Sequence, residues 1–221
     1  MQNVLLFLGS CGLIAAFAWY FSKLGQNALT ALVAILSLLA NLFVLKQIDF
    51  MGLNATASDA FTIGSLLGLN LLQEKYGKTA ATSAIWTSFA GLVFFALMSQ
   101  IHLLYQPSIY DQSQASYQFL LSPAPRILIA SLLTFLIADQ CDVKLYAFLR
   151  AKYPQISMIF ISAISMSCSQ LLDTVLFSLL GLYGVVQAIV EIIVVSYGIK
   201  LLAIANTIPW SFMTRRLLAN D

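Results

Sequence analysis

Seven long apolar runs make up most of the 221-residue chain and restrict what it can fold into. They cover about residues 4–22, 28–48, 57–74, 79–101, 126–147, 155–181 and 185–212. A helix of roughly 20 apolar residues crosses a hydrocarbon core, where only helices and closed barrels satisfy their own backbone. The alternating strands of about ten residues that a barrel needs are absent. The sequence therefore predicts an all-α fold, a polytopic membrane helical bundle, formed as one integral membrane domain over residues 1–221.

Composition excludes several other classes of protein. Charged residues make up 9% of the chain and hydrophobic residues 60%, whereas soluble domains contain about 25% charged residues. The net charge of +2 is too small to indicate a nucleic-acid partner. No Cys/His spacing suits a metal and no phosphate-binding loop is present, so no metal or cofactor is expected. If a membrane protein of this composition moves a solute against its gradient, the energy must come from an ion gradient, from a separate ATPase or from metabolic trapping of the solute.

The distribution of basic residues predicts the orientation. Eight of the eleven basic residues fall at alternate ends of the predicted spans, all on one side: Lys23, Lys75, Lys78, Lys144, Arg150, Lys152, Arg215 and Arg216. Basic residues concentrate in cytoplasmic loops, so we expect a cytoplasmic C-terminus and an external N-terminus. The first run lacks the basic start of a signal peptide, which favours a retained helix over a cleaved one.

Polar side chains inside the apolar runs are the candidate functional residues, because a charge at bilayer depth costs on the order of 3 kcal/mol. They are Asn41, Asn70, Glu74, Asp139, Gln140, Asp142, Gln170, Asp173, Tyr197 and Lys200. At a rise of about 1.5 Å per residue, Asn41, Asp173 and Lys200 lie roughly 10–20 Å from the external surface. Asp142 and Glu74 fall near the cytoplasmic boundary. The spacing thus predicts an upper level that forms a binding pocket, and a lower level that forms a gate or an anchor.

Each candidate also has a structural alternative. In the structural interpretation, Asp173 and Lys200 form a buried ion pair whose role is to hold two helices together. Glu74 and Asp142 are interfacial anchors that pair with nearby lysines, and Asn41 makes only an interhelical hydrogen bond. The meeting of an acid, a base and amides from different helices favours a site instead.

Such a pocket suits a planar, nitrogen-rich ligand. A carboxylate accepts two parallel N–H donors, and a glutamine or asparagine both donates and accepts. Phe177 and Tyr197 supply rings that stack on a flat ligand. The residues permit this chemistry without requiring it.

Four runs in order resemble the queuosine precursor transporter family, also called the VUT family. They are NLLQEKYGKTAA (70–81), ASLLTFLIADQCDVKLYAFLR (130–150), SQLLDTVLFSLLG (169–181) and VSYGIKLLAIANTIP (195–209). The resemblance covers roughly residues 36–212 and implies an inner-membrane importer of deazapurine bases such as preQ0, preQ1 or queuine, used in tRNA modification. It implies six core spanning helices, similar to the substrate-binding components of energy-coupling-factor transporters. The first apolar run is then an extra N-terminal helix, which departs from this six-helix pattern.

The resemblance also implies substrate-binding residues. The positions that match the polar pattern of the family are Asn41, Glu74, Asp142, Gln170, Asp173 and Lys200. Two positions depart from it, because Asn70 stands where Asp is common and Asp139 where Gln is usual. These departures leave the choice among the nitrile, aminomethyl and cyclopentenyl precursors open.

Three other functions compete with this one. An intramembrane aspartyl protease needs a proton-sharing dyad, and its expected Gly-x-Gly-Asp context is absent; a serine nucleophile needs a histidine, and His102 lies in the predicted external loop. We therefore expect no enzyme. A membrane assembly or biogenesis protein without transport, and an importer of another purine-like or vitamin-like solute, remain as alternatives.

Overall fold

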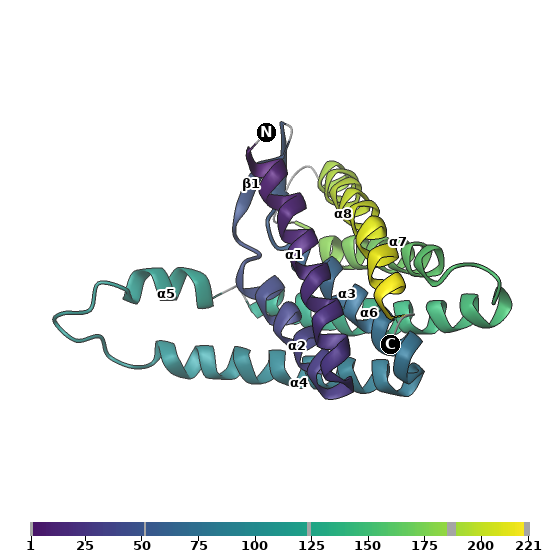
Figure 1. The fold of residues 1–221 in the computed structure, drawn as a ribbon. Helices are drawn as coiled ribbons and strands as arrows, with labels where there is room; N and C mark the ends of the chain where they lie inside the picture. The colour runs from purple at the N-terminus through teal and green to yellow at the C-terminus, as the bar shows by residue number, and fades with distance from the viewer. Residues whose placement is uncertain (1, 51, 123–124, 185–188, 219–221) are drawn as a thin grey trace.

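Helices form almost all of the computed structural model, which describes residues 2–50, 52–122, 125–184 and 189–218. The elements in chain order are α1 (Gln2–Leu24), α2 (Gln26–Leu42), β1 (Gln47–Phe50), β2 (Leu53–Thr56), α3 (Asp59–Tyr76), α4 (Lys78–Leu103), α5 (Gln114–Leu121), α6 (Pro125–Lys152), α7 (Met158–Phe177), η1 (Ser178–Leu182) and α8 (Ile189–Leu218). Figure 1 shows α1 and α8 crossing the other long helices, while α5 and the loop before it project to one side.

Several of these helices are able to span a membrane. By length and composition four described segments qualify: α1, α4, α7 together with η1, and Ile189–Trp210 of α8. A fifth span results if α5 and α6, which are bent by 50° at the break between them, count as one. The prediction of a polytopic helical membrane protein is thus confirmed, while a count of seven spans stays a prediction. Residues 185–188 of the last predicted span lie outside the described residues.

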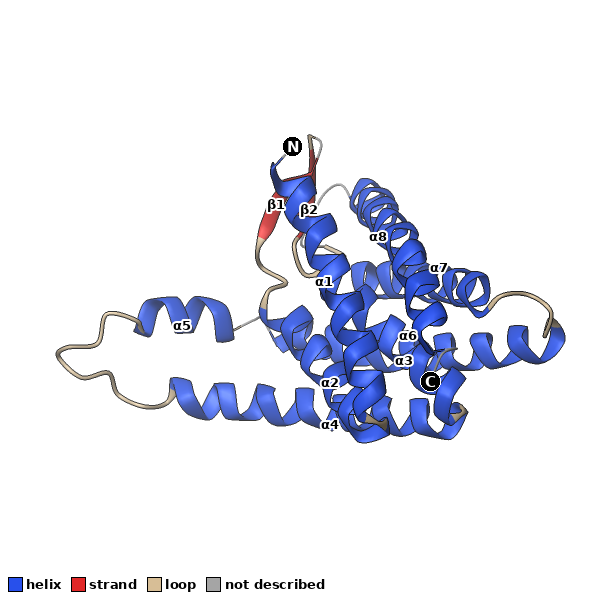
Figure 2. Ribbon diagram, viewed as in Figure 1, coloured by secondary structure: helices blue, strands red, loops and turns tan. Residues whose placement is uncertain are grey.

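A short antiparallel hairpin accompanies the helices and corrects one predicted boundary. The run at 28–48 stays helical only to Leu42, and β1 pairs with β2 with Phe50 opposite Leu53 (Figure 2). Gly52 has a φ of +83° in the connection, and its N–H donates to Asp49 Oδ1 at 3.1 Å. The left-handed conformation at a glycine is what a tight hairpin requires. Apolar composition alone did not separate this segment from the helix before it.

Helix α3 lies at the centre of the bundle, and its glycines admit two neighbouring helices. A Cβ added to Gly64 would collide with the side chain of Ile14 from α1. One added to Gly68 would lie 2.7 Å from Val33 Cγ2 of α2. The GxxxG spacing therefore allows close approach of helices, as in other membrane bundles. Since Ile14 fills this contact, α1 belongs to the packed core.

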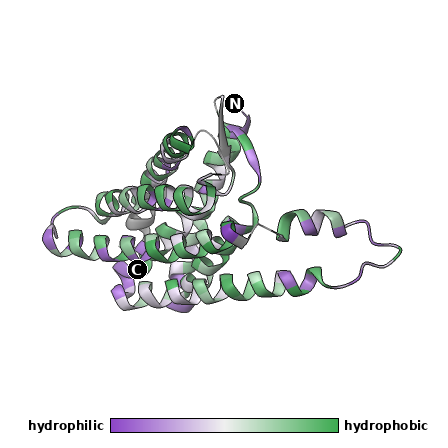
Figure 3. Cartoon of the chain, turned by 180° about the vertical axis from the view of Figure 1, so that it is seen from behind, coloured by the Kyte–Doolittle hydropathy of each residue, from purple (hydrophilic) through white to green (hydrophobic). Residues whose placement is uncertain are grey.

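The outer surface of the long helices is apolar. Large hydrophobic side chains such as Leu13 of α1, Phe94 of α4 and Val194 of α8 are 61–65% exposed. Figure 3 shows hydrophobic colour along the long helices, with hydrophilic colour in the loop between α4 and α5. Soluble monomers rarely expose contiguous apolar surface on this scale, so the surface fits contact with lipid.

Arg126 fastens the start of α6 to the end of η1. Its Nε donates to the Leu180 carbonyl at 2.8 Å, and its Nη2 donates to the Tyr183 carbonyl at 2.9 Å. Carbonyls at the end of a helix lack intrahelical donors, and the guanidinium supplies them here. The π-helical turn η1 that follows α7 is thereby held against α6.

The close contact at Gly64 predicts a position-specific loss of stability. Gly64→Ala forces Ile14 to move, so the free energy of unfolding in detergent should fall by about 1–3 kcal/mol. Gly91→Ala on α4 is the matched control, since no atom lies within 4 Å of its added Cβ. Equal thermal stability of the two variants would contradict the packing described for α3.

Candidate functional site

A cavity of about 180 Å³ lies between α2, α3, α6, α7 and α8 and is lined largely by polar side chains. The polar lining residues are Ser37, Asn41, Thr56, Ser58, Asp59, Thr62, Ser65, Ser131, Thr134, Asp139, Asp173, Thr174, Ser178, Ser196 and Lys200. Phe135 and Phe177 add aromatic rings. Four of the predicted site residues therefore meet here: Asn41, Asp139, Asp173 and Lys200.

An ion pair between α7 and α8 is the central interaction of this cavity. Lys200 Nζ donates to Asp173 Oδ2 at 2.5 Å and to Thr174 Oγ1 at 3.1 Å. The side chain of Lys200 is 9% exposed and that of Asp173 is 20% exposed. Both charges are thus largely removed from solvent, and each depends on the other for compensation. The pair foreseen as a structural alternative exists, and it also lines the cavity.

Asn41 connects α2 to α6 at the rim of the same cavity. Ser131 Oγ donates to Asn41 Oδ1 at 2.7 Å, and Asn41 Nδ2 donates to the Ser37 carbonyl at 3.1 Å. Asn41, Ser131 and Phe177 also line a neighbouring apolar cavity of about 70 Å³ that extends to Leu120 and Leu121 of α5. The amide therefore lies where the polar cavity meets an apolar one.

Two further carboxylates face the cavity. Asp59 begins α3, and Asp139 lies in the middle of α6; each is 4% exposed. The Oδ2 atom of each is buried without a hydrogen-bond partner among the described residues. Sequence reasoning missed Asp59 because an acid in the first turn of a helix is ordinary. The signal that could have found it is its place inside the apolar run 57–74.

A second buried polar cluster joins α6 and α7 away from the cavity lining. Asp142 Oδ1 accepts hydrogen bonds from Ser165 Oγ at 2.7 Å and from Ser169 Oγ at 3.3 Å. Asn70 Nδ2 donates to Ser162 Oγ at 2.8 Å, and Gln170 is 1% exposed. Ser162, Ser165 and Ser169 of α7 thus supply the hydrogen-bond partners in this cluster.

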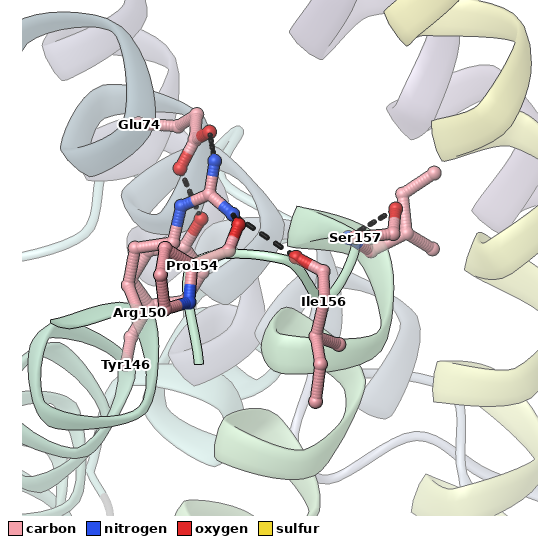
Figure 4. Close-up of polar contacts among 7 residues, drawn as sticks. Glu74, Tyr146, Arg150, Pro154, Ile156 and Ser157 are labelled. Carbon is pink, nitrogen blue, oxygen red and sulfur yellow. Dashed lines mark hydrogen bonds and ion pairs between the residues drawn. The ribbon is translucent and has the colours of Figure 1, made fainter. Parts of the chain in front are cut away.

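Glu74 lies outside the cavity lining, in a network at the end of α3 (Figure 4). It accepts from Tyr146 Oη at 2.6 Å and from Arg150 Nη2 at 2.7 Å. Arg150 also donates to the Ile156 carbonyl at 3.0 Å, so the network holds the segment between α6 and α7 against α3. The predicted partners were nearby lysines, but Lys75 Nζ donates to the Ser22 carbonyl at 2.8 Å instead.

Tyr197 and Gln140 are the remaining candidates, and neither is among the described residues that line the cavity. Tyr197 Oη donates to the Ser167 carbonyl of α7 at 3.3 Å. Gln140 is half-buried, directly after Asp139. On α8 it is Ser196 and Lys200 that face the cavity.

Helices apolar enough to cross a membrane surround a cavity lined by charged side chains, which is the arrangement of a multi-pass membrane protein. The family model described as "Putative vitamin uptake transporter" matches residues 56–214, which is most of the chain. The chain belongs to this transporter family, and the resemblance seen in its sequence is confirmed. No solved structure matches it significantly.

Among curated proteins, the chain is similar to the "Probable queuosine precursor transporter" of Bacillus subtilis (strain 168). The two are 28% identical over 205 residues, which covers 91% of this chain and 90% of the relative. The similarity therefore covers more of the chain than the region matched by the family model.

The ion pair predicts a characteristic pattern in a double-mutant cycle. Asp173→Asn or Lys200→Met alone leaves one buried charge without compensation, so stability in detergent should fall by on the order of 3 kcal/mol. The double variant removes both charges and should regain most of this loss. Additive losses in thermal unfolding would contradict a direct interaction.

The Glu74 network predicts an effect on stability rather than on substrate affinity. Glu74→Gln weakens the bonds to Tyr146 and Arg150, so the free energy of unfolding should fall by about 1–2 kcal/mol. Tyr146→Phe removes one of the same bonds and serves as the comparison. A rise in the KM for uptake at normal protein level would show instead that Glu74 contacts substrate.

Proposed function

We propose that this protein imports queuosine precursors, which are deazapurine bases, for use in tRNA modification. The observation that carries the proposal is the cavity that contains Asn41 and the Asp173–Lys200 pair inside a bundle of this transporter family. The printed name of the Bacillus subtilis relative supports the same substrate class.

The chemistry of the lining suits a small planar base. Carboxylate, ammonium, amide and hydroxyl groups offer both donors and acceptors to the edges of a deazapurine. Phe135 and Phe177 supply rings for its faces. Sites for drug-sized ligands occupy roughly 300–1,000 Å³, so a cavity of about 180 Å³ fits a bicyclic base better than a larger solute.

In this proposal, the second buried polar cluster, between α6 and α7, contacts the base after the cavity does. Asp142, Gln170 and Asn70 form a second binding position between the cavity and the cytoplasmic side. The base reaches it after it leaves Asp173. Their buried oxygens Asp142 Oδ2, Gln170 Oε1 and Asn70 Oδ1 have no partner among the described residues, which supports contact with a passing solute. Glu74, Tyr197 and Gln140 support the helices that form this path.

The setting of the transporter is part of the proposal. The chain forms one domain in the inner (plasma) membrane with a cytoplasmic C-terminus, as the placement of its basic residues favours. Its core has six spanning helices like the substrate-binding components of energy-coupling-factor transporters, with α1 added. An ion gradient, an ATPase module or metabolic trapping drives uptake, and uptake measured with and without a protonophore separates the first from the others.

Uptake of labelled precursor by cells that lack a carrier and cannot make the precursor tests the proposal. The chain should restore uptake, and Asp173→Asn or Gln170→Ala should reduce it at least about tenfold at equal membrane level, which corresponds to loss of about 1.4 kcal/mol of hydrogen bonding to the base. Asp111→Asn is the matched control, because the Asp111 side chain is exposed and accepts hydrogen bonds from Ser113 in the loop before α5, away from the cavity.

Two results would overturn it. No uptake of any precursor by the folded protein contradicts the assigned substrate class. Normal uptake by the stable double variant Asp173→Asn/Lys200→Met contradicts the assigned site, since that variant keeps the packing while it loses both charges.

A further inference from the structure

The lining of the cavity contains more acidic than basic side chains. Asp59 from α3, Asp139 from α6 and Asp173 from α7 all line it, and Lys200 is the one basic residue among its described lining residues. Lys200 is already bound to Asp173 and Thr174. Among the described residues, no cation is bound to the other two carboxylates, those of Asp59 and Asp139.

The unpartnered atoms are all oxygens that accept hydrogen bonds. Asp59 Oδ2, Asp139 Oδ2 and Thr134 Oγ1 are buried, line the cavity and have no hydrogen-bond partner among the described residues. A buried polar atom in this state is unfavourable unless a ligand or water satisfies it. Each of the three atoms can accept an N–H, so the cavity offers acceptors to a ligand that donates.

The residues around Asp139 favour a positively charged donor over a neutral one. The charged residues that act on it are Asp142 and Asp173, which are both acidic. Asp59 is influenced by Lys200 as well as by Asp173. No basic residue is among the groups that act on Asp139, so a positive group of the ligand is most favoured there.

A divalent metal ion does not fit this arrangement. Within the described part of the chain, no three His, Cys, Asp or Glu side chains are grouped so that they could hold one. An organic cation needs only hydrogen-bond acceptors and a negative potential, which Asp59, Asp139 and Thr134 provide.

We propose that the cavity selects a substrate with a cationic amino group, which binds at Asp139 and Asp59 while the planar ring lies against Asn41 and the Asp173–Lys200 pair. This inference rests on the proposed function and narrows it. Among queuosine precursors it selects the aminomethyl base and its cyclopentenyl derivative, whose amines are protonated at neutral pH. It disfavours the nitrile base, which is uncharged at that position.

Binding of the aminomethyl and nitrile bases to the purified full-length protein in detergent tests this selection. The wild-type protein should bind the aminomethyl base at least about tenfold more tightly, as expected for charged hydrogen bonds. Asp139→Asn and Asp59→Asn should reduce this ratio toward one, chiefly by weakening the aminomethyl base. The control Asp111→Asn should keep the wild-type ratio.

The outcomes separate this inference from the proposed function. Equal affinity for both bases, or preference for the nitrile, overturns the selection of a cation and leaves import of precursors intact. Binding of neither base overturns the proposed function itself.

Stability of the ligand-free variants distinguishes a binding role from a structural one. Asp139→Asn should unfold at the temperature of wild type or above it, since it keeps the size of a buried side chain whose Oδ2 has no partner among the described residues. A lower unfolding temperature would assign Asp139 to the packing of the bundle and overturn its role as a receptor for the amine. Thr134→Val, which is nearly isosteric, should also lower the binding ratio, and an unchanged ratio counts against the proposal.

Discussion

The rest of the cavity depends on the ion pair between Asp173 and Lys200. Neither charge is stable alone when it is buried in an apolar bundle. The pair fixes how α7 faces α8, and Thr174 adds a second acceptor for the ammonium. Once these groups are buried, the neighbouring positions must be polar or hydroxyl-bearing as well. The cavity lining with its serines, threonines and Asn41 follows from that requirement.

Helix α3 also helps to form the cavity. Its glycines bring α1 and α2 close, and its first residue, Asp59, reaches the cavity. At its other end Glu74 holds Arg150 and Tyr146 of α6. One central helix thus positions a cavity residue at one end and an anchoring network at the other, which explains why α3 carries polar groups that a lipid-facing helix would not tolerate.

The helices and several cavity residues were predictable from the sequence, for physical reasons that differ between residues. Apolar length predicted the helices, and the cost of a charge at depth singled out Asp173, Lys200 and Asp139 before any geometry was known. The hairpin of β1 and β2 escaped prediction because its four-residue strands are too short to show a pattern. The partners of Glu74 also escaped, since Arg150 and Tyr146 are distant in sequence and only packing brings them together.

A structure of the purified protein with an aminomethyl deazapurine bound tests the central claim most directly. The account predicts that the base lies between Asn41 and the Asp173–Lys200 pair, with its amine within hydrogen-bond distance of Asp139 or Asp59. A base bound outside this cavity, with the Asp173–Lys200 pair unchanged and untouched, would contradict it.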